Sequence, residues 1–203
     1  MPIKNNREYR NLVNFGISEN LEVEPYTVRG YATTFEPYVL FEYEGTEYKE
    51  QISRDAFVGA DITDVIFQYN HDGKVFARTK NGTLELFVDE GGLGVKANLG
   101  TTNSAKEMYE EIRAGLIDQM SFAFTVAEEH YDSETHTRII DRFKKIYDVS
   151  AVSIPANPTT QIGVSARSAF EGYIENDKQE LLRAEKRARD KKKLLLKMKL
   201  GGF

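Results

Sequence analysis

The stretch at 120–126 carries the first residue whose type and position could support chemistry, Ser121. Large apolar residues alternate with small ones along it: Met120, Phe122, Phe124 and Val126 against Ser121, Ala123 and Thr125. This period of two predicts a half-buried strand with Ser121 on the face of the small residues. A serine at the start of a strand could be a nucleophile, although most serines in strands are only small polar neighbours within the sheet.

A carboxylate, Asp148, is the second candidate. If a two-residue turn at Glu134–Thr135 closes a hairpin after this strand, residues whose numbers add to 269 face each other. Ser121 is then opposite Asp148. A slip of one residue would put the two side chains on opposite faces of the hairpin.

His71 is the candidate base. The chain has three histidines, and His130 and His136 flank the predicted hairpin turn, where we expect them to face solvent. His71 ends the apolar stretch 64–70 and begins an Asp-Gly turn, so its imidazole could face a cleft. The alternative is a turn histidine bonded locally to Asp72. No metal is expected at these two residues, because adjacent residues rarely bind one ion together and no third ligand is apparent.

A serine, an imidazole and a carboxylate together suit acyl transfer. A serine hydroxyl is a weak nucleophile until a neighbouring base removes its proton. Imidazole can accept that proton and return it around neutral pH. A carboxylate bonded to the other ring nitrogen fixes the tautomer and stabilises the imidazolium. The chain order His, Ser, Asp differs from three familiar serine-protease orders, which predicts a separate fold with the same roles.

The elements that would position these residues are mostly short strands. We expect a helix at 104–117, with Ser104 as its N-cap in a capping-box pattern with Glu107, and a short helical segment at 52–60. The other strands are expected at 26–35, 39–48 (with a bend at Gly45), 64–70, 75–80, 84–89 and 93–99. Many short strands with glycine turns predict an α+β, mainly β fold: a barrel or sandwich with helical insertions.

Length and charge predict one domain with a tail. The 203 residues are enough to bury a sizeable core. Residues 176–203 hold ten Lys or Arg against four Asp or Glu, a net charge of +6, and the whole chain carries −5, which leaves −11 for residues 1–175. We therefore expect an acidic domain at 1–165 and a basic helical tail at 166–203.

Composition also argues against several classes of function. Without cysteine the chain has no disulfide, no thiolate zinc site and no cysteine nucleophile. We find no apolar run of about 18 residues and no signal-peptide pattern, so we expect a cytosolic protein without a membrane partner. No Walker loop or dinucleotide-binding fingerprint occurs, and no cofactor is expected. The basic run at the end is unspecific, and nucleic-acid binding is not expected.

Three blocks, in this order, resemble the prohead (capsid maturation) proteases of tailed phages, which are similar to herpesvirus assemblin. The blocks are Arg29–Phe35, Tyr69–Asp72, and Met120–Phe124 followed by Tyr147–Ala156. The likeness spans roughly residues 20 to 165. It implies an assemblin-like β-barrel surrounded by helices. It also implies a serine endopeptidase that acts in the host cytoplasm, inside the immature capsid.

The resemblance also implies a role for each candidate. His71 corresponds to the family's base, Ser121 to its nucleophile, and Asp148 to its acidic third member, which is more often Glu. The segment Asp55-Ala-Phe57 departs from the more usual Gly-Ala-Phe. The implied substrates are the major capsid protein and scaffold segments, and the resemblance leaves a homo-oligomer open.

The tail and the activity both keep alternatives. The tail could be a solvated or partner-packed helix, or a removable or targeting segment that docks on acidic scaffold surfaces. We expect Pro155–Gly163 to resist regular structure, and a cut between Ile162 and Leu200 that requires Ser121. A catalytically silent capsid-assembly or scaffolding protein would be favoured by an unaligned His71 and Ser121. A small-molecule esterase would be favoured by a deep closed pocket.

Overall fold

The computed structural model describes residues 7–13, 15–17, 25–153 and 161–199. The chain divides into two compact units, residues 1–166 and residues 167–203. The first unit holds the described strands and the helix α1, Asn103–Arg113, and the second consists mostly of the helix α2, Gln161–Lys199. Neither α-helix is long and apolar enough to cross a bilayer over its described residues. The division of function that we expect between these two parts stays a prediction.

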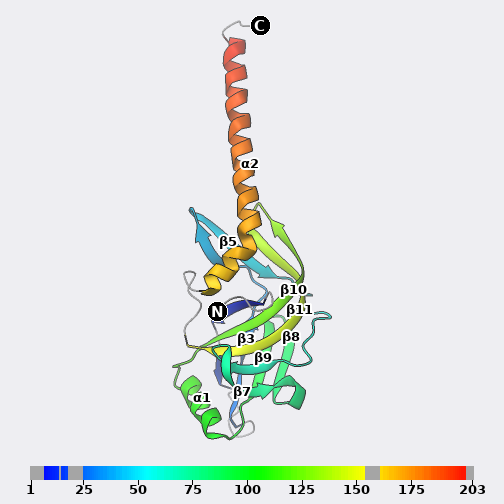
Figure 1. The fold of residues 1–203 in the computed structure, drawn as a ribbon, viewed down its shortest axis with the longest axis vertical. Coiled ribbons are helices and arrows are strands. Elements are labelled where there is room, and N and C mark those ends of the chain that lie inside the picture. The colour runs from blue at the N-terminus through cyan, green and yellow to red at the C-terminus, as the bar shows by residue number, and fades with distance from the viewer. Residues whose placement is uncertain (1–6, 14, 18–24, 154–160, 200–203) are drawn as a thin grey trace. The chain divides into compact units, whose positions relative to one another are not determined.

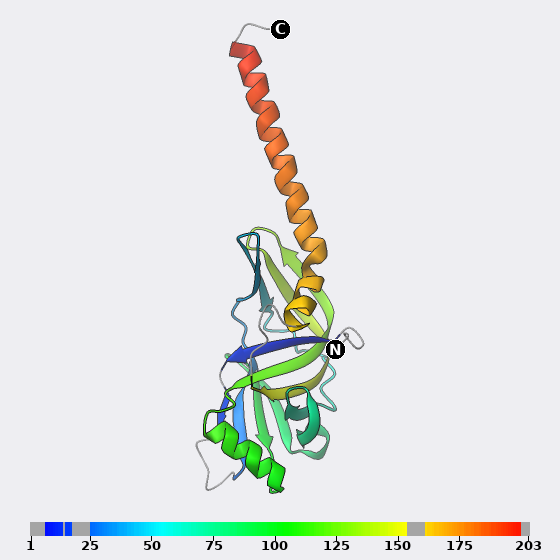
Figure 2. The same cartoon turned by 60° about the vertical axis from the view of Figure 1, so that its left-hand side comes forward.

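A long antiparallel hairpin is the centre of the larger sheet (Figure 1). Its strands are β10, Gln119–Asp132, and β11, Thr137–Val152. On the edge away from β11, β10 pairs with β1, Glu8–Val13, which Figure 2 draws in blue alongside it. The other strands of this sheet are β4 (Tyr38–Tyr43), β5 (Thr46–Ile52), β6 (Ile66–Tyr69) and β7 (Asp72–Arg78).

The second edge of β11 is shared between two strands. β5 runs parallel to its first part, at 137–140, and β6 runs parallel to its last part, at 148–151. β6 then turns back antiparallel into β7. β11 therefore connects the part of the sheet next to β5 with the part that carries the β6–β7 hairpin.

The smaller sheet has four strands in the order β2-β3-β9-β8. Glycine is required where β9 begins, because a Cβ on Gly92 would lie 1.9 Å from the carbonyl oxygen of Thr33. The Gly-Gly turn therefore lets β9 approach β3 closely. The strands are β2 (Phe15–Ile17), β3 (Thr27–Thr33), β8 (Leu84–Asp89) and β9 (Gly92–Asn98), and a short 3-10 helix η1, Thr79–Asn81, precedes β8.

The large apolar residues of the hairpin form the centre of the core. Phe122 and Phe124 are fully buried, and the ring of Phe124 lies 4.9 Å from that of Phe143 in an edge-to-face pair. Each buried aromatic side chain of this kind contributes about 2–3 kcal/mol through burial alone. This burial confirms the prediction that the large residues of 120–126 face the core. Ser121 and Ala123 lie on the opposite face, which is also fully buried, so the prediction of a half-buried strand is wrong over 120–125.

The helix α1 lies within the predicted range but begins differently. Its N-cap is Thr102, whose hydroxyl accepts a hydrogen bond from the backbone N–H of Ala105 at 3.2 Å. The predicted cap at Ser104 is therefore wrong, because the acceptor for a free N–H group of the first turn is Thr102, one residue before the helix begins. Met108 and Ile112 are buried on this helix, whereas Leu116 lies beyond it and is exposed.

Three other expectations about secondary structure are wrong. Ile52 ends β5 and residues 54–59 form turns, so 52–60 is no helix. Backbone groups of this segment bond to β11: the N–H of Ser53 donates to Ile140 O and the N–H of Phe143 donates to Ala56 O. The polar opening was not expected to form strands, yet β1 and β2 precede the predicted first strand. α2 begins at Gln161, so the expectation of irregular structure through Gly163 is wrong from that residue on, and residues 154–160 lie outside the described residues.

The α+β, mainly β class is confirmed. The described strands form two sheets, of seven and four strands, and no closed barrel is assigned among them. The likeness to assemblin therefore stays a prediction.

Candidate active site

Ser121 is fully buried in β10, and its neighbour on β11 is Ser150. The predicted pairing with Asp148 is wrong, since Asp148 lies opposite Ala123. Partner numbers add to 269 next to the hairpin turn and to 271 at Ser121, because irregularities between them add two residues to β11. A shift of two keeps every side chain on its face, so Asp148 still lies on the same face as Ser121.

The turn of the hairpin differs in length from the prediction. Asp132 pairs with Thr137, which leaves a four-residue loop centred on Glu134 and Thr135. The Asp132 carboxylate accepts hydrogen bonds from the Glu134 N–H and the Thr135 hydroxyl, both at 2.9 Å. These local bonds support the wider loop.

His71 lies in the tight turn between β6 and β7. The turn residues are Asn70 and His71, one position before the predicted Asp-Gly turn, and both have left-handed backbone angles (φ of 48° and 57°). Two consecutive left-handed residues match the two-residue turn whose twist suits a hairpin. Such angles are uncommon for a residue with a side chain and carry a modest cost in energy, which is more often found at functional positions.

Asn70 holds this turn against the end of β11. Its backbone N–H donates to the carbonyl oxygen of Ala151 at 3.0 Å. Its side-chain amide donates to the Ser153 hydroxyl at 3.3 Å and accepts from the Ser153 N–H at 3.2 Å. The position of His71 is therefore fixed by bonds to the same strand that carries Asp148.

The structure brings the three candidate residues within hydrogen-bond distance. His71 Nε2 lies 2.6 Å from Ser121 Oγ, and His71 Nδ1 lies 2.5 Å from Asp148 Oδ1. An imidazole that carries its proton on Nδ1 satisfies both contacts: it donates to the carboxylate and accepts from the hydroxyl. The His71 side chain is 14% exposed and that of Asp148 is 6% exposed, so the charged group lies beneath the base.

Ser150 is a fourth member that the sequence analysis did not identify. Its hydroxyl donates to Asp148 Oδ1 at 2.7 Å and lies 3.2 Å from His71 Nδ1. The available signal was the period of two in β11, which places residues 148 and 150 on one face. The bond to Ser150 holds the Asp148 carboxylate in the orientation that meets the imidazole.

Tyr9 is a second neighbour that was missed. Its ring centre lies 4.7 Å from that of His71, with 72° between the ring planes, and it comes from β1 opposite Ala123. Burial and, after it, the negative charge of Asp148 raise the pKa of the Tyr9 phenol. Tyr9 was overlooked because the opening residues were interpreted as polar chain before the first strand.

The other histidines lie apart from this cluster. His130 is exposed and its Nδ1 lies 2.6 Å from Asp141 Oδ2. His136 is half-buried and its ring lies 5.6 Å from that of Tyr48, so only His130 faces solvent as predicted. Asp72 accepts a hydrogen bond from the N–H of Gly73. Across the part of the chain that the structure describes, no group of three or more His, Cys, Asp or Glu could hold a metal ion.

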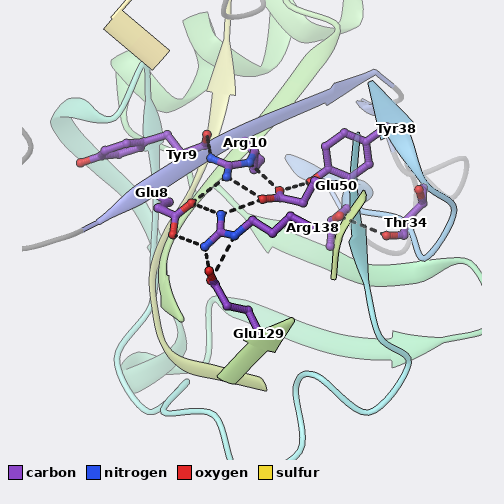
Figure 3. A network of polar contacts seen from close by, with 9 residues as sticks. Glu8, Tyr9, Arg10, Thr34, Tyr38, Glu50, Glu129 and Arg138 are labelled. Carbon is purple, nitrogen blue, oxygen red and sulfur yellow. Dashed lines mark hydrogen bonds and ion pairs between the residues drawn. The ribbon is translucent and has the colours of Figure 1, made fainter. Parts of the chain in front are cut away.

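The opposite face of β1 carries a buried network of charges (Figure 3). Arg10 donates two hydrogen bonds to Glu50, at 2.5 and 2.6 Å, and one to Glu8 at 2.7 Å. Arg138 bonds to the same two carboxylates and to Glu129. We call these five residues the charge network; Arg10, Glu50 and Arg138 are almost completely buried.

The network keeps Glu8 and Arg10 ionised. Burial alone would raise the pKa of Glu8, but the hydrogen bonds and charges of Arg138 and Arg10 lower it to about 2. Burial alone would lower the pKa of Arg10, yet the charges of Glu50 and Glu8 raise it. Each buried ion is thus compensated by partners from other strands, which is the condition for keeping charges in a protein interior.

Comparison with known proteins gives one match. The family described as caudovirus prohead serine protease matches residues 14–173, which is 160 of the 203 residues. No curated protein and no solved structure matches the chain. The matched segment contains His71, Ser121 and Asp148, and it begins after β1.

Proposed function

We infer the function from the premise that this chain belongs to the caudovirus prohead serine protease family. Membership makes it a capsid maturation protease in general terms. We propose that it is a serine endopeptidase that cuts capsid and scaffold proteins inside the immature phage head. The observation that supports this most directly is the continuous contact of Ser121 Oγ with His71 Nε2, and of His71 Nδ1 with Asp148.

In the proposed reaction Ser121 Oγ forms a bond to the carbonyl carbon of the substrate peptide. The hydroxyl proton passes to His71 Nε2 as the carbonyl electron pair moves onto oxygen. The carbon–nitrogen bond then breaks, and the leaving amine takes the proton from His71. Water attacks the acyl group in the same way and releases the second product. Asp148, held by Ser150, stabilises the imidazolium in both steps.

The two alternatives differ from this proposal in what they require. A silent scaffolding protein has no need for an aligned pair, so the 2.6 Å between His71 Nε2 and Ser121 Oγ supports an active protein. An esterase would use the same three residues on a small acyl group. The choice of substrate, and not the triad, therefore distinguishes an esterase from an endopeptidase.

The proposal extends to processing of the chain itself within the tail. Proteases bind their substrates in an extended form, and α2 covers 161–199, so a cut between Ile162 and Leu200 requires the helix to unwind locally. Exposed leucines along α2, such as Leu181 and Leu195, give it little burial to resist unwinding.

The test is co-expression of the full chain with the major capsid protein of the same phage, followed by mass spectrometry of both proteins. Wild type should produce discrete capsid fragments and Ser121→Ala should leave the capsid protein intact. A folded wild type that cuts nothing and ignores fluorophosphonate probes would favour the silent protein. Hydrolysis of p-nitrophenyl esters without peptide cleavage would favour the esterase. A wild-type mass equal to that of Ser121→Ala, while the capsid protein is cut, would exclude self-processing.

A further inference from the structure

The strand β1 presents different chemistry on its two faces. Glu8 and Arg10 belong to the charge network, and Tyr9 lies between them on the strand (Figure 3). The ring of Tyr9 contacts that of His71. We propose that Tyr9 is a positioning residue for His71 and that the charge network holds Tyr9 in place. This inference rests on the proposed function, in which His71 is the base.

The two hydrogen bonds of His71 do not fix its ring completely. Nδ1 is held by Asp148 and Nε2 by Ser121, yet the ring can still tilt about the line through these two contacts. A neighbour that packs against the ring away from its nitrogens removes this freedom. The Tyr9 ring, at 4.7 Å and 72°, has the edge-to-face geometry that stabilises aromatic pairs.

A small residue makes room for this contact. Tyr9, Ala123 and Asp148 lie opposite one another on β1, β10 and β11, so their side chains share one face of the sheet. Ala123 is fully buried and adds only a methyl group between the phenol and the carboxylate. The imidazole contacts Asp148 at this level of the sheet. It also contacts Ser121, which lies two residues before Ala123 on β10.

The charge network fixes the register of β1. β1 is an edge strand of the larger sheet and, among the described strands, pairs with β10 only. Its backbone hydrogen bonds alone therefore give little resistance to a shift in register. A slip of one residue would move Tyr9 to the core face and leave the network's Glu50 and Arg138 without Arg10 and Glu8. Because uncompensated buried charge is strongly unfavourable, the register that keeps Tyr9 beside His71 is selected.

The family match begins at residue 14, so Tyr9 belongs to a segment outside it. The part of the chain that completes the surroundings of the base therefore reaches further toward the N-terminus than the matched segment. The contact between Tyr9 and His71 is therefore tested in this chain itself.

The experiment compares Tyr9→Phe, which keeps the ring, with Tyr9→Leu, which removes it. The readouts are the rate at which a fluorophosphonate probe modifies Ser121 between about pH 5 and 9, and the NMR signals of the His71 ring. Tyr9→Phe should react within about two-fold of wild type. Tyr9→Leu should react roughly ten-fold more slowly, with an altered pH profile and shifted His71 signals, because one aromatic pair is lost.

A matched control is Tyr26→Leu. Tyr26 also forms an edge-to-face pair, with Tyr109 at 5.5 Å and 75°, among residues that do not contact His71. It should lose stability without a change in the pH profile of probe labelling. Tyr9→Met, which keeps more bulk without a ring, replaces Tyr9→Leu if the latter does not fold.

The outcomes separate the two proposals. A wild type that ignores the probe overturns the proposed function and the role of Tyr9 with it. A reactive wild type with an equally reactive Tyr9→Leu and an unchanged pH profile overturns the role of Tyr9 alone. The same conclusion follows if Tyr9→Phe is as slow as Tyr9→Leu, since the ring would then not be what matters.

Discussion

The larger sheet carries two buried polar clusters that are built on opposite principles. The charge network joins two guanidinium groups to three carboxylates, and Glu50 within it also accepts from the Tyr38 hydroxyl at 2.6 Å. The cluster of His71, Ser121, Asp148 and Ser150 contains one carboxylate and otherwise groups that are neutral or gain charge only with a proton. The charge network consists only of acidic and basic side chains. The second cluster has one carboxylate, and its other three side chains can each exchange a proton.

The difference shows how burial separates stability from reactivity. In the charge network each oxygen of Glu50 accepts two hydrogen bonds, and the guanidinium groups of Arg10 and Arg138 do not give up a proton. The network therefore holds strands together without offering a base or a nucleophile. In the second cluster the hydrogen bond between Ser121 Oγ and His71 Nε2 can reverse its direction when one proton moves, and Ser121 Oγ keeps lone pairs for a bond to carbon. We therefore expect substitutions in the two clusters to affect different measurements.

The largest loss of activity should come from Ser121→Ala, and the matched substitution at Ser150, the residue opposite it, should cost much less. Ser121→Ala should lower proteolysis by about 10⁴- to 10⁶-fold, because the reacting atom is lost. Ser150→Ala removes the same hydroxyl from the paired position and should cost only about ten-fold, since Asp148 keeps its bond to His71. Steady-state kinetics with a capsid-derived peptide measures both. Equal losses would remove the distinction between the reacting serine and the supporting one.

The next effect separates the base from the carboxylate. His71→Ala should be almost as damaging as Ser121→Ala, whereas Asp148→Asn should retain more activity, about 10⁴-fold below wild type. The carboxylate orients and stabilises the imidazole without exchanging atoms with the substrate. Wild-type activity in a folded Asp148→Asn protein would show that the third member lies elsewhere.

The charge network should respond in stability. Glu50→Gln leaves two buried guanidinium groups short of charge and should lower the free energy of unfolding by about 3–5 kcal/mol, measured by urea denaturation. Glu47→Gln is the matched control on the same strand, because Glu47 is exposed and pairs with Lys49 at the surface. It should change stability by less than about 0.5 kcal/mol. Similar values for the two variants would mean that the network contributes no more than surface charge.

The smallest effect should appear in acid. The pKa of Glu8 is lowered from its usual 4.5 to about 2, so its contribution is complete above pH 4.5 and is lost as the pH falls toward 2. Glu8→Gln should lower stability by a few kcal/mol at neutral pH and by progressively less toward pH 2. Unfolding curves from pH 2 to pH 7 measure the difference between the proteins. A difference that is constant over this range would assign the titration to another group.

The three candidate residues of the sequence analysis, His71, Ser121 and Asp148, lie in hydrogen-bond contact, whereas several strands around them were not predicted. Alternation placed Ser121 correctly on the face away from the core, since a period of two depends only on local pattern. The exact partner of Ser121 could not be predicted, because irregularities in a long hairpin leave no clear local signal. β1 was missed for another reason: Glu8 and Arg10 are buried only because Glu50 and Arg138, distant in sequence, compensate them.

The separation of these contacts along the chain determines when the site can form. His71 meets Ser121 across 50 residues and Asp148 across 77, and Glu8 meets Arg138 across 130. Such distant contacts form late, after the entropy of closing long loops has been overcome. During synthesis, a chain that has not yet reached β11 has neither Asp148 nor the partner that holds β1. The order of synthesis thus delays formation of the site of His71, Ser121 and Asp148 until β11 has been made.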